Sequence, residues 1–133
     1  MATHLNNKLG RIVFSVDDVD DLHSYARALR SLDELRAVGK LKECVMCVGS
    51  YEGAIEPRFM VLAKDFEDHI RGAWYISEQE SILRIPGDVR QPCVLEYLSG
   101  GLRLTLGKMR ESQDIRGADG WTYVIESGKY YQS

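Results

Sequence analysis

The stretch RFMVLAKDFEDHIRGAW, at residues 58–74, joins a predicted strand directly to a predicted helix. Its first part, Phe59-Met-Val-Leu-Ala63, is apolar at every position, which predicts a strand covered on both faces near the centre of a sheet. Asp65 is the expected cap of the helix. Apolar residues at positions i, i+4, i+7 and i+8 then form one helical face that should pack on the sheet. They are Phe66, Ile70, Ala73 and Trp74.

The segments on either side of this stretch predict further strands and one more helix. Apolar patterns predict strands at residues 11–16, 42–49, 81–85, 93–98, 102–106 and 121–125. A longer helix is expected over about residues 18–38, with Asp17 or Asp18 as its cap. The capping box Ser31-Leu-Asp-Glu34 predicts a break or kink in it, and Gly39 ends it. This order predicts an α+β fold, a mainly antiparallel sheet with two helices packed on one side.

Length and composition limit the class of protein. At 133 residues the chain is expected to form a single domain, residues 1–133, and its 44% of hydrophobic residues suffices for a buried core. The net charge of −3 has the wrong sign for generic nucleic-acid binding. No apolar run approaches the roughly 18 residues of a membrane span, and residues 1–8 lack the layout of a secretion signal. We therefore expect a cytoplasmic protein that does not bind membranes.

The three cysteines indicate neither a disulfide framework nor a metal site. Their odd number fits a reducing compartment. Cys44 and Cys47 have the spacing C-x-x-C, but residues 43–48 have the composition of a strand, on which positions i and i+3 point to opposite faces. Glycine spacings also fail to match a phosphate-binding loop or a dinucleotide fingerprint. We expect buried structural thiols, no metal and no cofactor.

Two polar segments are candidate binding sites. The connector at residues 49–57 is long for a hairpin and polar at its tip, and an exposed tyrosine among charges is typical of an interface. A loop with basic residues at 107–120 suits a phosphate or an acidic partner. The alternative interpretations are a tyrosine packed on the core and a solvated loop. The candidate binding residues are Tyr51, Glu52, Glu56 and Arg58 in the first segment and Arg110, Asp114 and Arg116 in the second.

The polar residues Gln79 and Glu80 form a third candidate, directly before the strand at 81–85. Glu80 has the chemistry of a general base and Gln79 that of an amide that recognises a ligand. The alternative is a helix-to-strand turn whose side chains satisfy backbone groups. No nucleophile elbow and no recognisable Ser-His pair is present, so no catalytic residue is assigned. Trp74, Trp121 and Tyr123 occupy periodic positions and are expected in the core.

Several short motifs in the second part of the chain resemble a family of small uncharacterised phage and bacterial proteins. The resemblance covers about residues 48–131. One departure is Ser77-Glu78, which stands where the family has Tyr-Gly. It implies a phage origin and carries no activity with it. The matching motifs are Tyr51-x-Gly53, Glu56-x-x-Phe59, Gln79-Glu-Ser-Ile-Leu83, Leu106-Gly107, Trp121-Thr-Tyr123 and Tyr130-Tyr131.

These observations favour a phage-encoded, non-enzymatic interaction protein. On this hypothesis it acts in the cytoplasm of the bacterial host, where it binds and inhibits a host protein such as a CRISPR or other immune effector. One alternative is a protein that binds and sequesters a phosphorylated small molecule, for instance a nucleotide signal. A second alternative is an enzyme that uses Glu80. Association into a homo-oligomer is left open.

Overall fold

The computed structural model describes residues 10–16, 21–51, 54–76, 81–88, 90–112, 120–125 and 128–132, with the side chains of Tyr51, Ala54 and Ser112 left out. These residues form an α+β fold. Its helices are α1 (Leu22–Ala37), α2 (Ala63–His69) and the short 3-10 helix η1 (Trp74–Ile76). Its strands are β1 (Arg11–Phe14), β2 (Cys44–Tyr51), β3 (Ala54–Leu62), β4 (Ser81–Ile85), β5 (Pro92–Tyr97), β6 (Arg103–Lys108), β7 (Arg110–Ser112), β8 (Gly120–Val124) and β9 (Lys129–Gln132).

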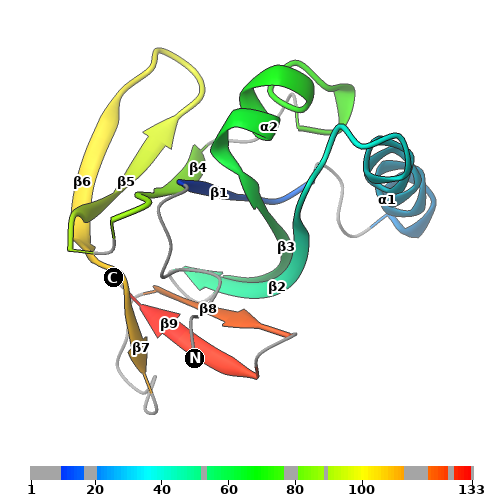
Figure 1. Cartoon of the computed structure of the whole chain (residues 1–133). Helices are drawn as coiled ribbons and strands as arrows, with labels where there is room; N and C mark the ends of the chain where they lie inside the picture. The colour runs from blue at the N-terminus through cyan, green and yellow to red at the C-terminus, as the bar shows by residue number, and fades with distance from the viewer. Residues whose placement is uncertain are drawn as a thin grey trace.

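The strands form one sheet that curls into a nearly closed barrel (Figure 1). The strand order is β6-β5-β4-β1-β3-β2-β8-β9-β7, and every neighbouring pair is antiparallel. Both α-helices lie on the outside of the sheet (Figure 1). The predicted α+β class and antiparallel sheet are therefore confirmed. Within the described residues, neither helix is long and apolar enough to span a bilayer.

The central strand β3 has buried side chains on both faces, as its sequence predicts. Phe59 and Val61 belong to a hydrophobic cluster between the sheet and the helices, which also contains Phe66 and Ile70 of the α2 region. Met60 points the other way, into a second cluster enclosed by the barrel. Because side chains alternate along a strand, one fully apolar segment supplies both cores.

Helix α1 is shorter at its start than expected and is unbroken. It begins after Asp21, whose carboxylate accepts the backbone N–H of His23 at 3.0 Å and caps the helix. Asp17 and Asp18, the expected caps, lie outside the described residues. The predicted break at Ser31 is wrong, because the helix continues and the Ser31 hydroxyl donates to the carbonyl of Arg27. Gly39, with φ 80°, follows the helix as expected.

Helix α2 begins at Ala63, and its Asp65 has a different role from the predicted cap. The Asp65 carboxylate accepts the backbone N–H of Lys42 at 3.0 Å, which fixes the chain entering β2. Phe66 and Ile70 are fully buried, as predicted. The prediction for Trp74 is wrong, since α2 ends at His69 and Trp74 lies in η1 with 49% of its surface exposed. The helical periodicity that begins at Phe66 therefore ends before Trp74.

Strands β2 and β3 form a hairpin that replaces the predicted long connector. They pair from Cys44 with Val61 to Tyr51 with Ala54, so residues 49–57 belong almost entirely to strands. Pro57 is tolerated in β3 because β1 ends at Phe14, opposite Phe59. The Pro57 carbonyl accepts a hydrogen bond from Ser15, so the side of Pro57 that lacks an N–H faces the region beyond the end of β1.

Candidate functional site

The predicted binding residues fall into three groups in the structure. The side chains of Glu56, Arg58 and Arg110 are described. Tyr51 is described as part of β2 without its side chain. The others lie outside the described residues, and they are Glu52, Gln79, Glu80, Asp114 and Arg116.

Arg110 does not join Glu56 and Arg58, because the sheet directs them to opposite sides. The register runs from Glu56 through Gly49, Thr122 and Tyr131 to Glu111, so these five positions share the inner side of the sheet. Arg110 directly precedes Glu111 in the chain, and neighbouring side chains of a strand point to opposite sides. Arg110 therefore points outward, where it is exposed. The predicted basic loop is also corrected, since Arg110 lies in strand β7.

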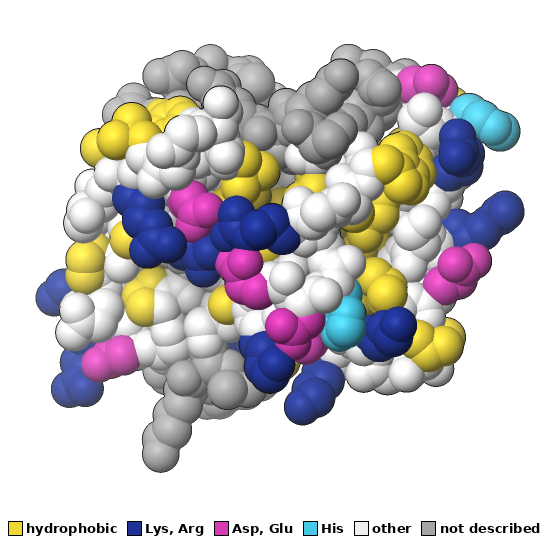
Figure 2. Space-filling view, turned by 90° about the horizontal axis from the view of Figure 1, so that it is seen from above, with side chains coloured by type: hydrophobic (Ala, Val, Ile, Leu, Met, Phe, Trp, Pro, Cys, Tyr) yellow, Lys and Arg dark blue, Asp and Glu magenta, His cyan; other side chains and the backbone are white. Residues whose placement is uncertain are grey.

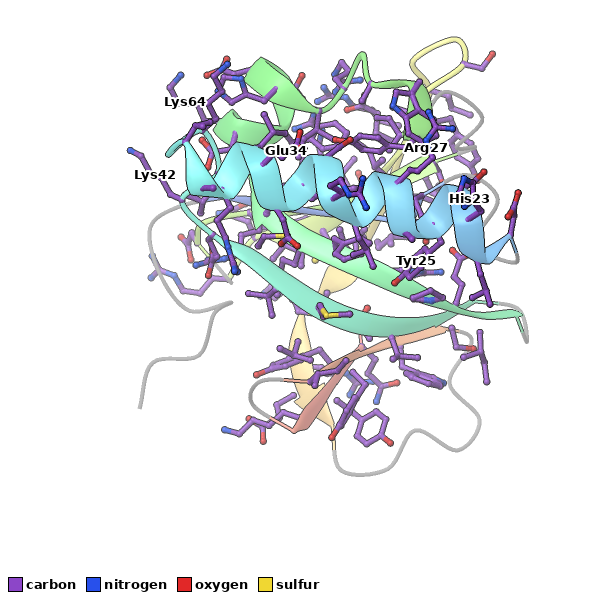
Figure 3. All side chains as sticks on the ribbon, turned by 90° about the vertical axis from the view of Figure 1, so that its right-hand side faces the viewer. His23, Tyr25, Arg27, Glu34, Lys42 and Lys64 are labelled. Atoms are coloured by element: carbon purple, nitrogen blue, oxygen red, sulfur yellow. The ribbon has the colours of Figure 1, made fainter. Side chains whose placement is uncertain are left out.

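The outer side of β2, β8 and β9 is a sheet face that neither α-helix covers. Figure 3 shows α1 lying across the upper part of the sheet, with β8 and β9 below it. Register pairing places Val48 beside Tyr123 and Tyr123 beside Tyr130 on this side. We call it the aromatic sheet face, and its members are Met46, Val48, Ile55, Trp121, Tyr123, Ile125 and Tyr130.

Three rings organise the centre of the aromatic sheet face. The ring of Tyr130 lies between the other two, with its centroid 5.5 Å from that of Trp121 and 4.7 Å from that of Tyr123. Around them, Ile55 is 67% exposed, Ile125 50% and Met46 48%. Arg110 lies on the same side, in the row of Trp121 and Gln132. Apolar side chains that are half exposed or more around partly buried aromatic rings, with an arginine at the rim, have the composition of a protein-binding surface.

This face corrects the predicted placement of Trp121 and Tyr123 in the core. The alternate residues Thr122 and Val124 are the buried ones in β8, with 7% and 1% exposure. Sequence reasoning chose the wrong side because both sides of the segment WTYVI are compatible with burial. The elements predicted from the sequence carried one signal, because two helices are few for covering the outside of a sheet with seven predicted strands.

A separate cluster of charges holds α2 against the sheet. Glu96, only 6% exposed, pairs with Arg84 at 2.6 Å, with Arg71 at 3.0 Å and with Arg103 at 3.5 Å. Glu67 of α2 bridges back to Arg71 at 2.6 Å and to Arg84. Figure 2 shows basic and acidic side chains gathered side by side on this face of the molecule. These arginines already have carboxylate partners, so we assign the cluster a structural role.

The charges in this cluster shift each other's pKa values. Hydrogen bonds from Arg71 and Arg84 lower the pKa of Glu67 to about 2, against the opposing effect of burial. Burial opposes ionisation of Glu96, but hydrogen bonds from Arg84 and Arg71 outweigh it, and its pKa is also lowered. Both carboxylates are therefore ionised near neutral pH and available to the arginines.

The cysteines lie in a strand, as expected, and on opposite sides of it. Cys47 belongs to the cluster inside the barrel, whereas Cys44 packs against the cluster beneath the helices. Burial raises the pKa of Cys44 to about 11 and that of Cys47 to about 12. Within the described residues, no three His, Cys, Asp or Glu side chains lie close enough together to hold a metal ion.

No protein-family model matches the chain, and no curated protein matches it.

Proposed function

We propose that this chain is a protein-binding domain whose aromatic sheet face docks onto a partner protein. The exposed side chains of that face carry the proposal. Met46 and Ile125 are each about half exposed beside the packed rings of Trp121, Tyr123 and Tyr130. Tyrosine and tryptophan supply large contact areas at low cost in side-chain entropy, and they recur among the residues that dominate binding energy.

The partner that we propose is a bacterial host protein. The motif resemblance to phage and bacterial proteins supports this class, and a CRISPR or other immune effector is the specific hypothesis. In this function the chain acts by occupying a surface of its target. The short sheet edge at β7 carries Arg110, which suits an acidic residue at the rim of such an interface.

The test is affinity capture of the partner with surface variants of the full chain. Met46→Glu and Ile125→Glu place charges on the aromatic sheet face at side chains that are already half exposed. They should abolish capture of the host partner and protection of phage, with nearly unchanged thermal unfolding. Leu22→Glu and Val38→Glu are matched controls, because these side chains are 80% and 68% exposed at the two ends of α1. They should retain both properties.

Two results would overturn the proposal. One is full capture and protection by the Met46→Glu and Ile125→Glu variants. The other is a native chain that forms a homodimer, which the same variants make monomeric while protection persists. In that case the aromatic sheet face joins two copies of the chain. Light scattering after size-exclusion chromatography distinguishes this outcome.

A further inference from the structure

Arg58 occupies one end of the barrel interior. It lies opposite Cys47 in β2, which in turn lies opposite Val124 in β8, and both of these neighbours are buried in the barrel cluster. The Arg58 side chain keeps 19% of its surface exposed. It therefore lies where the apolar interior meets solvent, on the side of the sheet opposite the aromatic sheet face.

A chain of hydrogen bonds orients this arginine. The hydroxyl of Ser15, which is 3% exposed, donates to Oε1 of Glu56 at 2.7 Å. The same oxygen accepts from Nε of Arg58 at 3.3 Å. The same hydroxyl proton is shared with the carbonyl of Pro57, 3.2 Å from Ser15 Oγ, which ties the group to the backbone of β3. The guanidinium is thus held from its Nε side.

Gly49 makes room for the guanidinium. A Cβ atom at this position would lie 2.5 Å from Cδ and Nε of Arg58 and 2.6 Å from its Cζ. These distances are far below van der Waals contact, so the arginine lies against the bare backbone of β2. Any larger residue at position 49 would displace it. A glycine in the interior of a strand weakens that strand, and here it permits the close approach of a charged side chain.

The terminal nitrogens distinguish Arg58 from the other ion-paired arginines inside or against the sheet. Arg11 donates to Glu43 through both Nε and Nη2, and Arg71 and Arg84 likewise use Nη atoms toward carboxylates. In the described part of the chain, Glu56 is the only hydrogen-bonding partner of the Arg58 guanidinium, and it uses Nε. The N–H groups on the Nη atoms of Arg58 can therefore donate hydrogen bonds to a planar oxyanion.

We propose that Arg58 binds the carboxylate group of a small molecule at this end of the barrel. The Nη edge of a guanidinium matches the two oxygens of a carboxylate in a parallel pair of hydrogen bonds. The net charge of the site also favours a ligand with a single negative charge. Arg58 and Glu56 together are neutral, so a carboxylate faces the positive edge, whereas a phosphate dianion would bring a second negative charge toward Glu56. This site is independent of the proposed partner surface, which lies on the other side of the sheet.

The test follows the side-chain NMR signals of Arg58 in the full chain during titration. Acetate and benzoate, added at constant ionic strength, should shift the Arg58 Nε–Hε resonance with saturation. Phosphate should shift it much less. In Glu56→Gln the negative charge is gone, so phosphate binding should rise relative to acetate. Arg58→Lys, which keeps the charge without the planar fork, should bind benzoate about tenfold more weakly.

The controls separate this site from a structural role and from the partner surface. Arg110→Gln, an arginine on the outer face, should leave the benzoate titration unchanged. Arg58→Gln should abolish it and yet retain capture of the protein partner. No saturable shift in the native chain, equal binding of phosphate and acetate, or benzoate binding that persists in Arg58→Gln would each overturn the assignment. The native titration decides even where a variant unfolds.

Discussion

The thiols of this protein are made inert by their surroundings. Cys47 and Cys93 are 1% and 0% exposed, and burial raises the pKa of Cys47 to about 12 and that of Cys93 to about 11. A thiol reacts through its thiolate, so very little reactive form exists at pH 8. We expect native chain to react with iodoacetamide far more slowly than chain unfolded in guanidinium. Equal rates, measured by mass spectrometry, would contradict this burial.

Glu67 makes stability depend on pH in the acid range. Its pKa of about 2 in the folded chain is below the ordinary value of 4.5, so the unfolded state binds more protons between these two values. The stabilisation is complete above about pH 4.5 and is lost as the pH falls toward 2. Because Glu67 is 38% exposed, solvent screening reduces its contribution to about 1 kcal/mol.

The variant Glu67→Gln should therefore lower the free energy of unfolding at pH 7 by about 1 kcal/mol. It should also flatten the pH dependence between 4.5 and 2, as measured by urea unfolding at a series of pH values. Asp68→Asn is the control on the same helix, because Asp68 pairs with the exposed Lys64. An equally steep pH dependence in native and Glu67→Gln chains would show that the Arg71 and Arg84 contacts do not persist in solution.

At the scale of elements, two apolar side chains add to the charge cluster in holding α2 against the sheet. Phe66 and Ile70 are fully buried against β1 and β3, and Phe14 lies 5.5 Å from the Phe66 ring. Truncation of Phe66 to alanine should cost about 3–5 kcal/mol in the free energy of unfolding. Trp74→Ala should cost clearly less, since half of that side chain is already in solvent. Guanidinium unfolding compares the two, and a reversed order would contradict the packing.

The elements that sequence patterns predict well are those with a single consistent signal. Phe59-Met-Val-Leu62 is apolar throughout and lies in β3 at the centre of the sheet, with both its faces covered as predicted, and Ala63 begins α2. The glycine and the proline at positions 49 and 57 suggest a loop, yet both lie in strands. Gly49 accommodates the Arg58 side chain, and Pro57 lies beyond the end of β1. At both positions, contacts with residues distant in the chain outweigh the preference of glycine and proline for loops, and no local sequence pattern reveals those contacts.

The whole molecule depends on pairings between distant parts of the chain. Cys47 pairs with Val124, and Val13 pairs with Leu83, so closure of the barrel cannot be read from neighbouring residues. For the same reason the sequence could not place the aromatic sheet face, whose members come from both halves of the chain. Nor could it bring Ser15 to Glu56, or show that Arg110 points away from Arg58.

Such long-range pairing also predicts slow folding. Loops must close before these strands can pair, and antiparallel β proteins rich in non-local contacts fold in roughly milliseconds to seconds. Stopped-flow refolding from guanidinium should show its main phase in that range. Refolding complete within microseconds would contradict the pairing of β2 with β8.

The strand order places β6 and β7 at the two ends of the sheet, although Met109 alone separates them in the chain. In the described residues, the two edge strands of the sheet therefore meet at Met109. An unpaired edge is where a sheet recruits strands from other molecules and begins to aggregate. Here β7 has three residues, with Arg110 and Glu111 exposed, and β6 carries exposed Arg103 and Lys108. The exposed charges on both edge strands and the shortness of β7 oppose such recruitment in the part of the chain that the structure describes, so the protein should resist fibril formation even at high concentration.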